Sequence, residues 1–265
     1  MAKENVNELV DKLTLFDDDL MSRVFDNNIE ATELMLRIIM GRNINVISVI
    51  GQDEIKSHEV GGRNITLDVH AIDVNGDEID IEVQGNSAGA HIRRARYHSS
   101  MVDSKMLDEG QEFRQLKDSY IIFIYKHDKF RKGLPVYHIE RYIRETEELF
   151  DDGSHIIYVN GNYKGNDEIG QLMNDFRQTD SDKIHCAALA KGVNHFKDTE
   201  KGREQMCEVV EKYAKKYAKE YAKEYAVKEK MISVKNLMEN MKLTVDQALN
   251  ALGIQGDERK TIINQ

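Results

Sequence analysis

The chain has 265 residues, of which 40% are apolar, and a formal net charge of −10 at pH 7. This length provides one sizeable core with an appendage, or two modest domains, and the acidic balance argues against a protein that coats nucleic acid by bulk electrostatics. No apolar run approaches a membrane span and the N-terminus lacks the apolar segment of a signal peptide, so we expect a cytoplasmic protein without a membrane partner.

The N-terminal third predicts helices followed by a strand. Residues 6–25 have apolar positions at helical spacing on both sides of the acidic run Asp17-Asp18-Asp19, which is typical of a helix N-terminus. The next helix is expected to begin at Asn27-Asn28-Ile29-Glu30, a pattern close to a capping box in which Glu30 is a cap residue. Gly41 then ends this helix, and residues 44–50 predict a first strand.

Residues 65–84 (ITLDVHAIDVNGDEIDIEVQ) predict two strands joined by a turn at Asn75-Gly76, because β-branched and polar residues alternate on both sides of a strong hairpin signal. Strand side chains alternate between faces, so the native register joins the two apolar faces. This register needs a three-residue loop or a bulge near Gly76. We expect the following pairs: Val69 with Val83, Asp68 with Gln84, and His70 with Glu82.

The predicted hairpin collects Asp68, Glu82 and Gln84 on one face. Two carboxylates held side by side, here next to an amide, repel each other unless a cation lies between them. Hard oxygen ligands favour Mg²⁺ or Mn²⁺ over zinc. The alternative interpretation is the solvated face of an antiparallel sheet.

Residues 91–107 predict a helix that follows the second strand after a short loop. Arg93, Arg94 and Arg96 lie within four positions, and Tyr97 lies one helical turn after Arg93. Beside carboxylates, such arginines are placed to hold phosphate oxygens by bidentate contacts. An exposed cationic helix face is the alternative, and the sequence leaves open which arginine points inward.

The segments that follow predict more strands and then helices. Residues 119–125 form a continuous apolar run that is typical of a central strand, and residues 134–139, with the only proline, predict an edge strand or connector. Residues 139–150 are expected to be irregular or helical, and residues 155–159 predict another strand. Two helical segments are expected next, at residues 167–176 and 183–196. The element order predicts an α/β (α+β mixed) fold, a mixed sheet flanked by helices.

The composition changes in the C-terminal part of the chain. Between residues 204 and 230, tyrosine recurs every four residues among Ala, Lys and Glu, at Tyr213, Tyr217, Tyr221 and Tyr225. This pattern predicts a linker helix. Two short amphipathic helices are expected after it, divided near Leu243-Thr244, with Thr244 as an N-cap. They are too small to stand alone, so we expect them to pack on the linker helix, a second copy of the chain or another partner.

Taken in order, these segments resemble the PD-(D/E)XK nuclease family transposases, also called the recombination-promoting nuclease family of bacteria. The pattern of Asp68 followed by Glu82-Val83-Gln84 is similar to the branch of the superfamily in which Gln replaces Lys. The similarity covers about residues 13–210 and is carried by LTLFDDDLMSRVF, RNITLDVHAIDVNGDEIDIEVQ, RRARYHSSMVD, LKDSYIIFIYKHDKF, GLPVYHIER and DDGSHIIYVNG. It implies a restriction-endonuclease-like nuclease domain at residues 1–205, followed by the linker helix at 206–230 and a small helical tail at 231–265.

The resemblance also implies a function, a Mg²⁺- or Mn²⁺-dependent DNA endonuclease. Asp68, Glu82 and the main-chain carbonyl of Val83 would hold the metal, and Gln84, which cannot act as a base, would orient the attacking water. The additional acids that it suggests are Asp18, within the pair Asp17-Asp18, and Glu30 or Glu33. Phosphate and DNA binding would fall to Arg93, Arg94, Arg96 and Tyr97.

A second hypothesis keeps the nuclease fold but not the activity. The change from Lys to Gln at residue 84 and the acidic balance suit a nucleic-acid-binding or oligomeric regulatory protein with weak or no catalysis. In that case the C-terminal helices would be the interaction device, forming a homo-oligomer.

Overall fold

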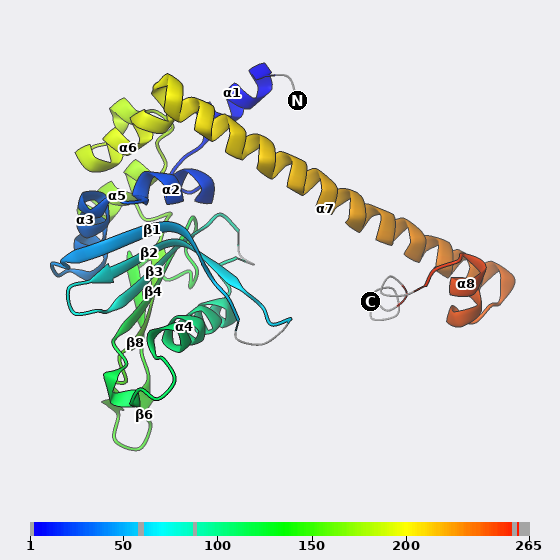
Figure 1. Ribbon diagram of the computed structural model, residues 1–265, viewed down its shortest axis with the longest axis horizontal. Coiled ribbons are helices and arrows are strands. Elements are labelled where there is room, and N and C mark those ends of the chain that lie inside the picture. Colours follow the sequence, from blue (N-terminus) through cyan, green and yellow to red (C-terminus); the bar gives the residue numbers. More distant parts are fainter. Residues whose placement is uncertain (1–2, 58–60, 87–88, 256–258, 260–265) are drawn as a thin grey trace. The chain divides into compact units, whose positions relative to one another are not determined.

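The computed structural model describes residues 3–57, 61–86, 89–255 and 259 (Figure 1). The chain divides into two compact units, Met1–Glu208 and Val209–Gln265. In the described part of the chain, no helix is long and apolar enough to cross a membrane.

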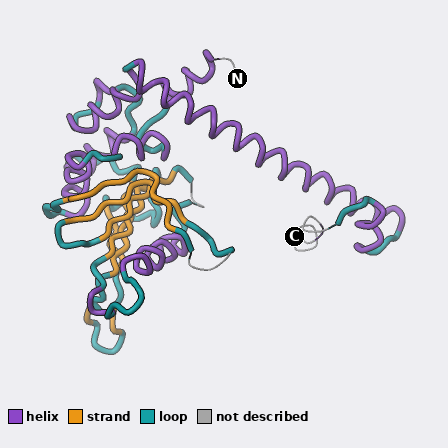
Figure 2. Tube along the Cα trace, in the orientation of Figure 1, coloured by secondary structure: helices purple, strands orange, loops and turns teal. Residues whose placement is uncertain are grey.

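The first unit is built on a mixed sheet, whose strands Figure 2 draws in orange. The sheet has six strands in the order β1-β2-β3-β4-β8-β5. The first three strands pair antiparallel, β3, β4 and β8 pair parallel, and β5 closes the edge antiparallel to β8. The strands are β1 (Val46–Ile55), β2 (Ile65–Asp73), β3 (Glu78–Gln84), β4 (Ser119–Tyr125), β5 (Val136–Ile139) and β8 (Ser154–Asn160). This arrangement confirms the predicted fold class and is consistent with a restriction-endonuclease-like core.

Helices cover both faces of this sheet (Figure 1). Helix α4 packs on one face, where Ala95 and Val102 join Ile121 and Phe123 of the central strand in a buried cluster. Helices α2, α3, α5 and α6 lie on the other side of the sheet. The helices of this unit are α1 (Lys3–Lys12), α2 (Asp18–Phe25), α3 (Ile29–Met40), α4 (Ile92–Met106), α5 (Glu168–Phe176) and α6 (Ala187–Asp198), with short 3₁₀ turns at Phe113–Gln115 and Ser181–Lys183.

Three local predictions need correction. The helix expected over residues 6–25 is interrupted, because the Asp17 carboxylate accepts hydrogen bonds from the backbone N–H and hydroxyl of Thr14, at 2.7 and 3.1 Å, and these bonds compete with helical ones. The N-cap of α3 is Asn28, which accepts from the Ala31 N–H, whereas Glu30 is exposed in the first turn. Within residues 139–150, β6 (Tyr142–Ile143) and β7 (Glu148–Leu149) form a two-stranded sheet.

The central hairpin is confirmed, but its predicted register is wrong by two residues. Val69 pairs with Ile81 and not with Val83, and His70 pairs with Asp80 and not with Glu82. The ladder ends before Asp68, so the predicted pair of Asp68 with Gln84 does not form. A shift of two residues leaves every side chain on the same face, so the apolar pattern does not distinguish the two registers. The loop decides between them. The Asp73 carboxylate accepts from the Asn75 and Asp77 N–H groups at 2.8 and 3.0 Å, and Gly76 adopts a φ of +84° that favours glycine.

The second unit contains most of α7 (Glu200–Met241) and α8 (Val245–Ala251). Helix α7 is continuous, so the predicted linker helix and the first predicted tail helix are one element. Thr244 is the N-cap of α8, as predicted, and its hydroxyl accepts from the Gln247 N–H. Ala248 and Leu249 are buried against Val234, so the tail packs on the end of α7. The tyrosine pattern at residues 213–225 lies outside the described side chains.

Candidate functional site

The β2–β3 ladder opens at the position of the predicted site. Its register ends at the pair Val69 with Ile81, whereas β3 stays paired with β4 as far as Gln84. On the other edge of β2, the register with β1 passes over Asp68 and Gln52, and Gln52 has a φ of +57°. The strands therefore separate beside Asp68, and side chains take the place of main-chain partners.

Asp68 and Glu82 occupy this opening and bridge the two strands. The Asp68 N–H donates to Glu82 Oε1 at 3.0 Å, and the Val83 N–H donates to Asp68 Oδ2 at 3.0 Å. Gln84 Nε2 lies 3.4 Å from Glu82 Oε2. The structure thus brings together Asp68, Glu82 and Gln84, the three residues to which the sequence pattern assigns the chemistry, although the register that joins them differs from the predicted one.

Gly89 leaves room for the Gln84 side chain. A Cβ atom built at Gly89 would lie 1.7 Å from Gln84 Oε1, well inside the contact distance of two atoms. Any larger residue at this loop position therefore displaces the Gln84 amide. The position of the Gln84 amide therefore depends on a residue without a side chain at Gly89.

Helix α4 contributes one arginine directly to this opening. Arg94 Nη2 donates to Glu82 Oε2 at 2.5 Å, and Arg94 Nε donates to His98 Nε2 at 3.2 Å. His98 follows Arg94 by one helical turn, so both side chains lie on the same face of α4. The guanidinium also lies over the Phe123 ring, 5.8 Å from its centre. Arg94 is therefore the arginine that points at the carboxylates.

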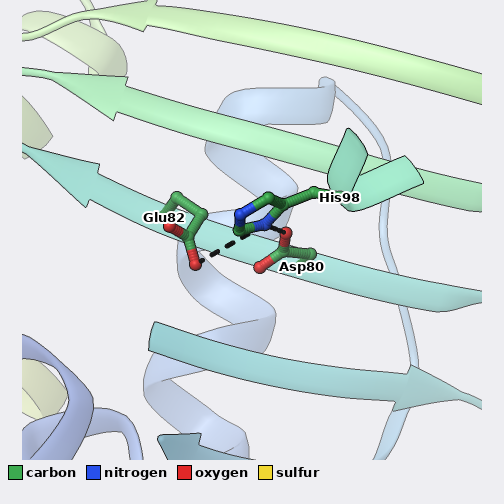
Figure 3. A group of neighbouring side chains, drawn as sticks. All are labelled: Asp80, Glu82 and His98. Atoms are coloured by element: carbon green, nitrogen blue, oxygen red, sulfur yellow. Dashed lines mark hydrogen bonds and ion pairs between the residues drawn. The ribbon is translucent and has the colours of Figure 1, made fainter. Parts of the chain in front are cut away.

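A buried group of Asp80, Glu82 and His98 lies directly beside this contact (Figure 3). The side chains converge from β3 and α4, with His98 Nδ1 2.7 Å from Asp80 Oδ2 and 4.0 Å from Glu82 Oε1. Asp80 and Glu82 are fully buried and His98 is 2% exposed. Their ligand atoms are close enough together to hold a metal ion. Within the described residues, Asp80 Oδ1 is a buried oxygen without a hydrogen-bond partner.

The site predicted from the sequence contains neither Asp80 nor His98, although the sequence pattern indicates the position of each. Strand alternation places Asp80 on the same face of β3 as Glu82. The four-residue spacing places His98 beside Arg94. What the sequence does not contain is the rotation of α4 over β3, which decides that these two faces meet.

Burial dominates the electrostatics of the three acids. It raises the pKa of Asp68, and the charge of Glu82 raises it further. Burial and the charge of Asp80 raise the pKa of Glu82 to about 8, despite the opposing effects of His98 and Arg94. The pKa of Asp80 is also raised well above its ordinary value, first by burial and then by Asp68. A divalent cation would replace the protons that these carboxyl groups hold, so the oxygen donors present fit Mg²⁺ or Mn²⁺.

A pocket of about 620 Å³ opens next to these acids. Its lining includes Asp18 from the first turn of α2 and Arg93 from α4. Tyr97 also lines it, and its hydroxyl donates to the Arg63 carbonyl at 2.7 Å. The lining residues are Asp18, Gln52, Arg63, Asn64, Ile65, Thr66, Asp68, His91, Arg93, Arg94, Tyr97 and His98.

Six residues of the predicted site are not among those that line this pocket: Glu82, Val83 and Gln84 of β3, and Arg96, Glu30 and Glu33. Arg96 is exposed on α4, and Glu30 is exposed at the start of α3. Glu33 accepts a hydrogen bond from the Val46 N–H at 2.9 Å, which ties α3 to the start of β1. The structure therefore brings Asp18 close to the acids of the hairpin, but not Glu30 or Glu33.

Comparison with known proteins identifies the family. A family model described as PD-(D/E)XK nuclease family transposase matches residues 26–168. The matched segment includes the hairpin with Asp68, Glu82 and Gln84, the arginines of α4 and the central strands β4 and β8. No curated protein and no solved structure matches the chain.

Proposed function

We propose that this chain, which belongs to the PD-(D/E)XK nuclease family transposases, is a divalent-metal-dependent DNA endonuclease. The observation that carries this proposal is the opening of the β2–β3 ladder. There Asp68 and Glu82 lie side by side, and Asp68 lines a pocket that arginines also line. Two buried carboxylates next to a pocket lined by arginines are groups that metal-assisted hydrolysis of a phosphodiester can use.

The metal would be held by Asp68, Glu82 and the main-chain carbonyl of Val83. These are hard oxygen donors, which suit Mg²⁺ or Mn²⁺. When bound, the cation would lower the pKa of a water molecule and neutralise charge that develops on the phosphate. The raised pKa values of both carboxyl groups support this assignment, because they show that neighbouring cations compensate the charge of these buried acids only in part. Asp18, in the same pocket, is the additional acid that we propose.

The cationic side of the pocket would bind the DNA backbone. Arg93 and Arg94 both line it, and a guanidinium holds two phosphate oxygens at once. Tyr97 would add a contact from the next turn of α4. Arg96 is exposed on the same helix and would contact the duplex outside the pocket. A local cationic path of this kind is compatible with the acidic balance of the whole chain.

Gln84 would orient the attacking water. Its amide has no basic lone pair and no charge, so it can act only through hydrogen bonds. The contact with Glu82 Oε2 places the amide at the edge of the proposed metal site. The cationic stabilisation that Lys supplies in other branches of the superfamily would come here from Arg94, which contacts the same carboxylate.

A plasmid-cleavage assay tests this proposal. Wild-type protein, Asp68→Asn and Glu82→Gln would be incubated with supercoiled plasmid in Mg²⁺, in Mn²⁺ and in EDTA, with Glu109→Gln, an exposed acid, as the matched control. We expect cleavage by the wild type and the control only, and only with metal, because both substitutions remove a metal ligand. Equal cleavage by all four proteins, or cleavage that survives EDTA, would exclude the proposal.

One observation favours a second candidate function, a nuclease-fold DNA-binding or regulatory protein with weak catalysis. Arg94 Nη2 lies 2.5 Å from Glu82 Oε2, so this acid has a cationic partner without a metal. Under this alternative the wild type would bind duplex DNA but would not cleave it in Mg²⁺ or Mn²⁺. Size-exclusion chromatography with light scattering would test the accompanying proposal of a homo-oligomer formed through the C-terminal helices.

A further inference from the structure

A continuous hydrogen-bonded chain joins Asp80 to Glu82 by way of α4. Asp80 Oδ2 lies 2.7 Å from His98 Nδ1, and His98 Nε2 lies 3.2 Å from Arg94 Nε. Arg94 Nη2 then lies 2.5 Å from Glu82 Oε2. Asp80 and Glu82, the first and last residues of this hydrogen-bonded series, are two residues apart on β3. The series therefore closes a ring between one strand and one helix.

The donors in this chain are determined by chemistry. A guanidinium nitrogen always carries its protons and can only donate, so His98 Nε2 accepts from Arg94. The imidazole is therefore neutral at that nitrogen, and its proton lies on Nδ1 and is donated to Asp80 Oδ2. Both ring nitrogens of His98 are thus engaged, one as acceptor and one as donor.

This assignment bears on the metal-binding capacity of Asp80, Glu82 and His98. His98 could ligate a cation through Nδ1 only after losing that proton, and the neutral ring would then carry its proton on Nε2, facing the Arg94 donor. A metal ion at this position and the Arg94 contact exclude each other. The arrangement present favours a different role, in which His98 supports the arginine.

Arg94 is held where a phosphate can reach it. Asp80 and His98 are buried, whereas the Arg94 side chain is 34% exposed and lines the pocket. Two of the five N–H groups of the guanidinium are directed to His98 and Glu82, which leaves the others for a ligand. A long side chain held at two points loses little further conformational entropy when it binds.

We propose that Asp80 and His98 form a positioning pair that aims the Arg94 guanidinium at a phosphate group of bound DNA. This inference rests on the proposed function, because the ligand is the DNA backbone. His98 accepts from Nε and so sets the plane of the guanidinium, and Asp80 holds the imidazole in the tautomer that makes it an acceptor. Asp80 and His98 are buried behind Arg94, so the pair acts on the phosphate through the arginine.

A double-mutant cycle on DNA binding tests the pair. Affinity for a short fluorescent duplex would be measured in Ca²⁺, over a range of salt, for Arg94→Ala, His98→Ala and the double variant. We expect Arg94→Ala to weaken binding about tenfold and to lower the salt slope by about one, as for one lost phosphate contact. His98→Ala should weaken binding severalfold in the wild type and have no further effect in the Arg94→Ala background.

Arg93→Ala is the matched control for coupling, because Arg93 lines the same pocket and it is Arg94 that donates a hydrogen bond to His98. In a double variant, the fold losses of DNA affinity from Arg93→Ala and His98→Ala should multiply. His98→Gln is the conservative variant, since an amide can accept from Arg94 and donate to Asp80, and it should restore most of the affinity. Asp80→Ala should behave like His98→Ala. Circular dichroism would verify that each variant is folded.

Nuclear magnetic resonance of the imidazole nitrogens gives a readout that needs neither DNA nor cleavage. With His98→Gln used to assign the signal, the ring should carry its proton on Nδ1 at neutral pH. Multiplicative effects of Arg94→Ala and His98→Ala, a proton on Nε2, or direct ligation of Mn²⁺ by His98 would overturn the inference. A protein with the expected tautomer and coupling that does not cleave DNA would instead refute the proposed endonuclease and leave the positioning pair intact.

Discussion

Replacing Glu82 by Gln should stabilise the metal-free protein at neutral pH while it abolishes metal binding. Glu82 is fully buried beside Asp80, and this environment raises its pKa from 4.5 to about 8. The folded state therefore retains a proton that the unfolded chain has released over this range. Because the folded state binds more protons than the unfolded chain, the free energy of unfolding falls as pH rises from 4.5 to about 8.

The size of this effect follows from the pKa difference. One pH unit corresponds to about 1.36 kcal/mol, so the whole difference is worth about 5 kcal/mol, of which about 3 kcal/mol is expressed at pH 7. Gln at position 82 cannot ionise, so the variant does not show this fall in the free energy of unfolding. We expect the stability of Glu82→Gln, relative to wild type, to increase by about 3 kcal/mol between pH 5 and pH 8.

Urea unfolding followed by circular dichroism, in EDTA and at several pH values across this range, measures the difference. Glu109→Gln, at an exposed position, is the matched control and should follow the wild type at every pH. Saturating Mg²⁺ should raise the stability of wild type and leave that of Glu82→Gln unchanged. If the difference between Glu82→Gln and wild type is the same at all pH values, burial does not hold a proton on Glu82 and the reasoning fails.

Three further predictions concern other parts of the molecule. Gln84→Ala should lower the cleavage rate on the order of 10²-fold with much less effect on metal affinity. Gly89→Ala should have the same effect, because its Cβ would displace the Gln84 amide. Wild-type rates in both variants would remove Gln84 from the mechanism. Lys197→Met should destabilise the protein by about 3 kcal/mol, because the buried ammonium donates to the carbonyls of Asp11, Leu13 and Thr179. Thermal unfolding measures this loss, with Lys191→Met at an exposed position as the control. A chain ending at residue 211 should fold and bind Mn²⁺ in calorimetry with the wild-type affinity; a folded truncation without binding would assign the C-terminal unit a part in the site.

Local signals in the sequence were sufficient for most of the elements and for the face on which the site lies. Gly41, the turn at Gly76 and the cap at Thr244 each act through a few neighbouring residues, so their effects are readable without the fold. Alternation along β2 and β3 likewise placed Asp68, Glu82 and Gln84 on one face. The predicted register is wrong by two residues, but this does not change the face on which these side chains lie, because the face repeats every second residue.

Only the tertiary structure decided how these faces meet. The register depends on how the Asp73 carboxylate closes the loop. The opening beside Asp68 arises because the pairing of β2 with β3 ends at Val69 and Ile81. The choice of Arg94 over Arg93 and Arg96, and the contact of His98 with Asp80, depend on how α4 is rotated on the sheet. A helical period defines a stripe of residues but not the strand against which it packs, because that choice is made by the fit of buried side chains across the whole core.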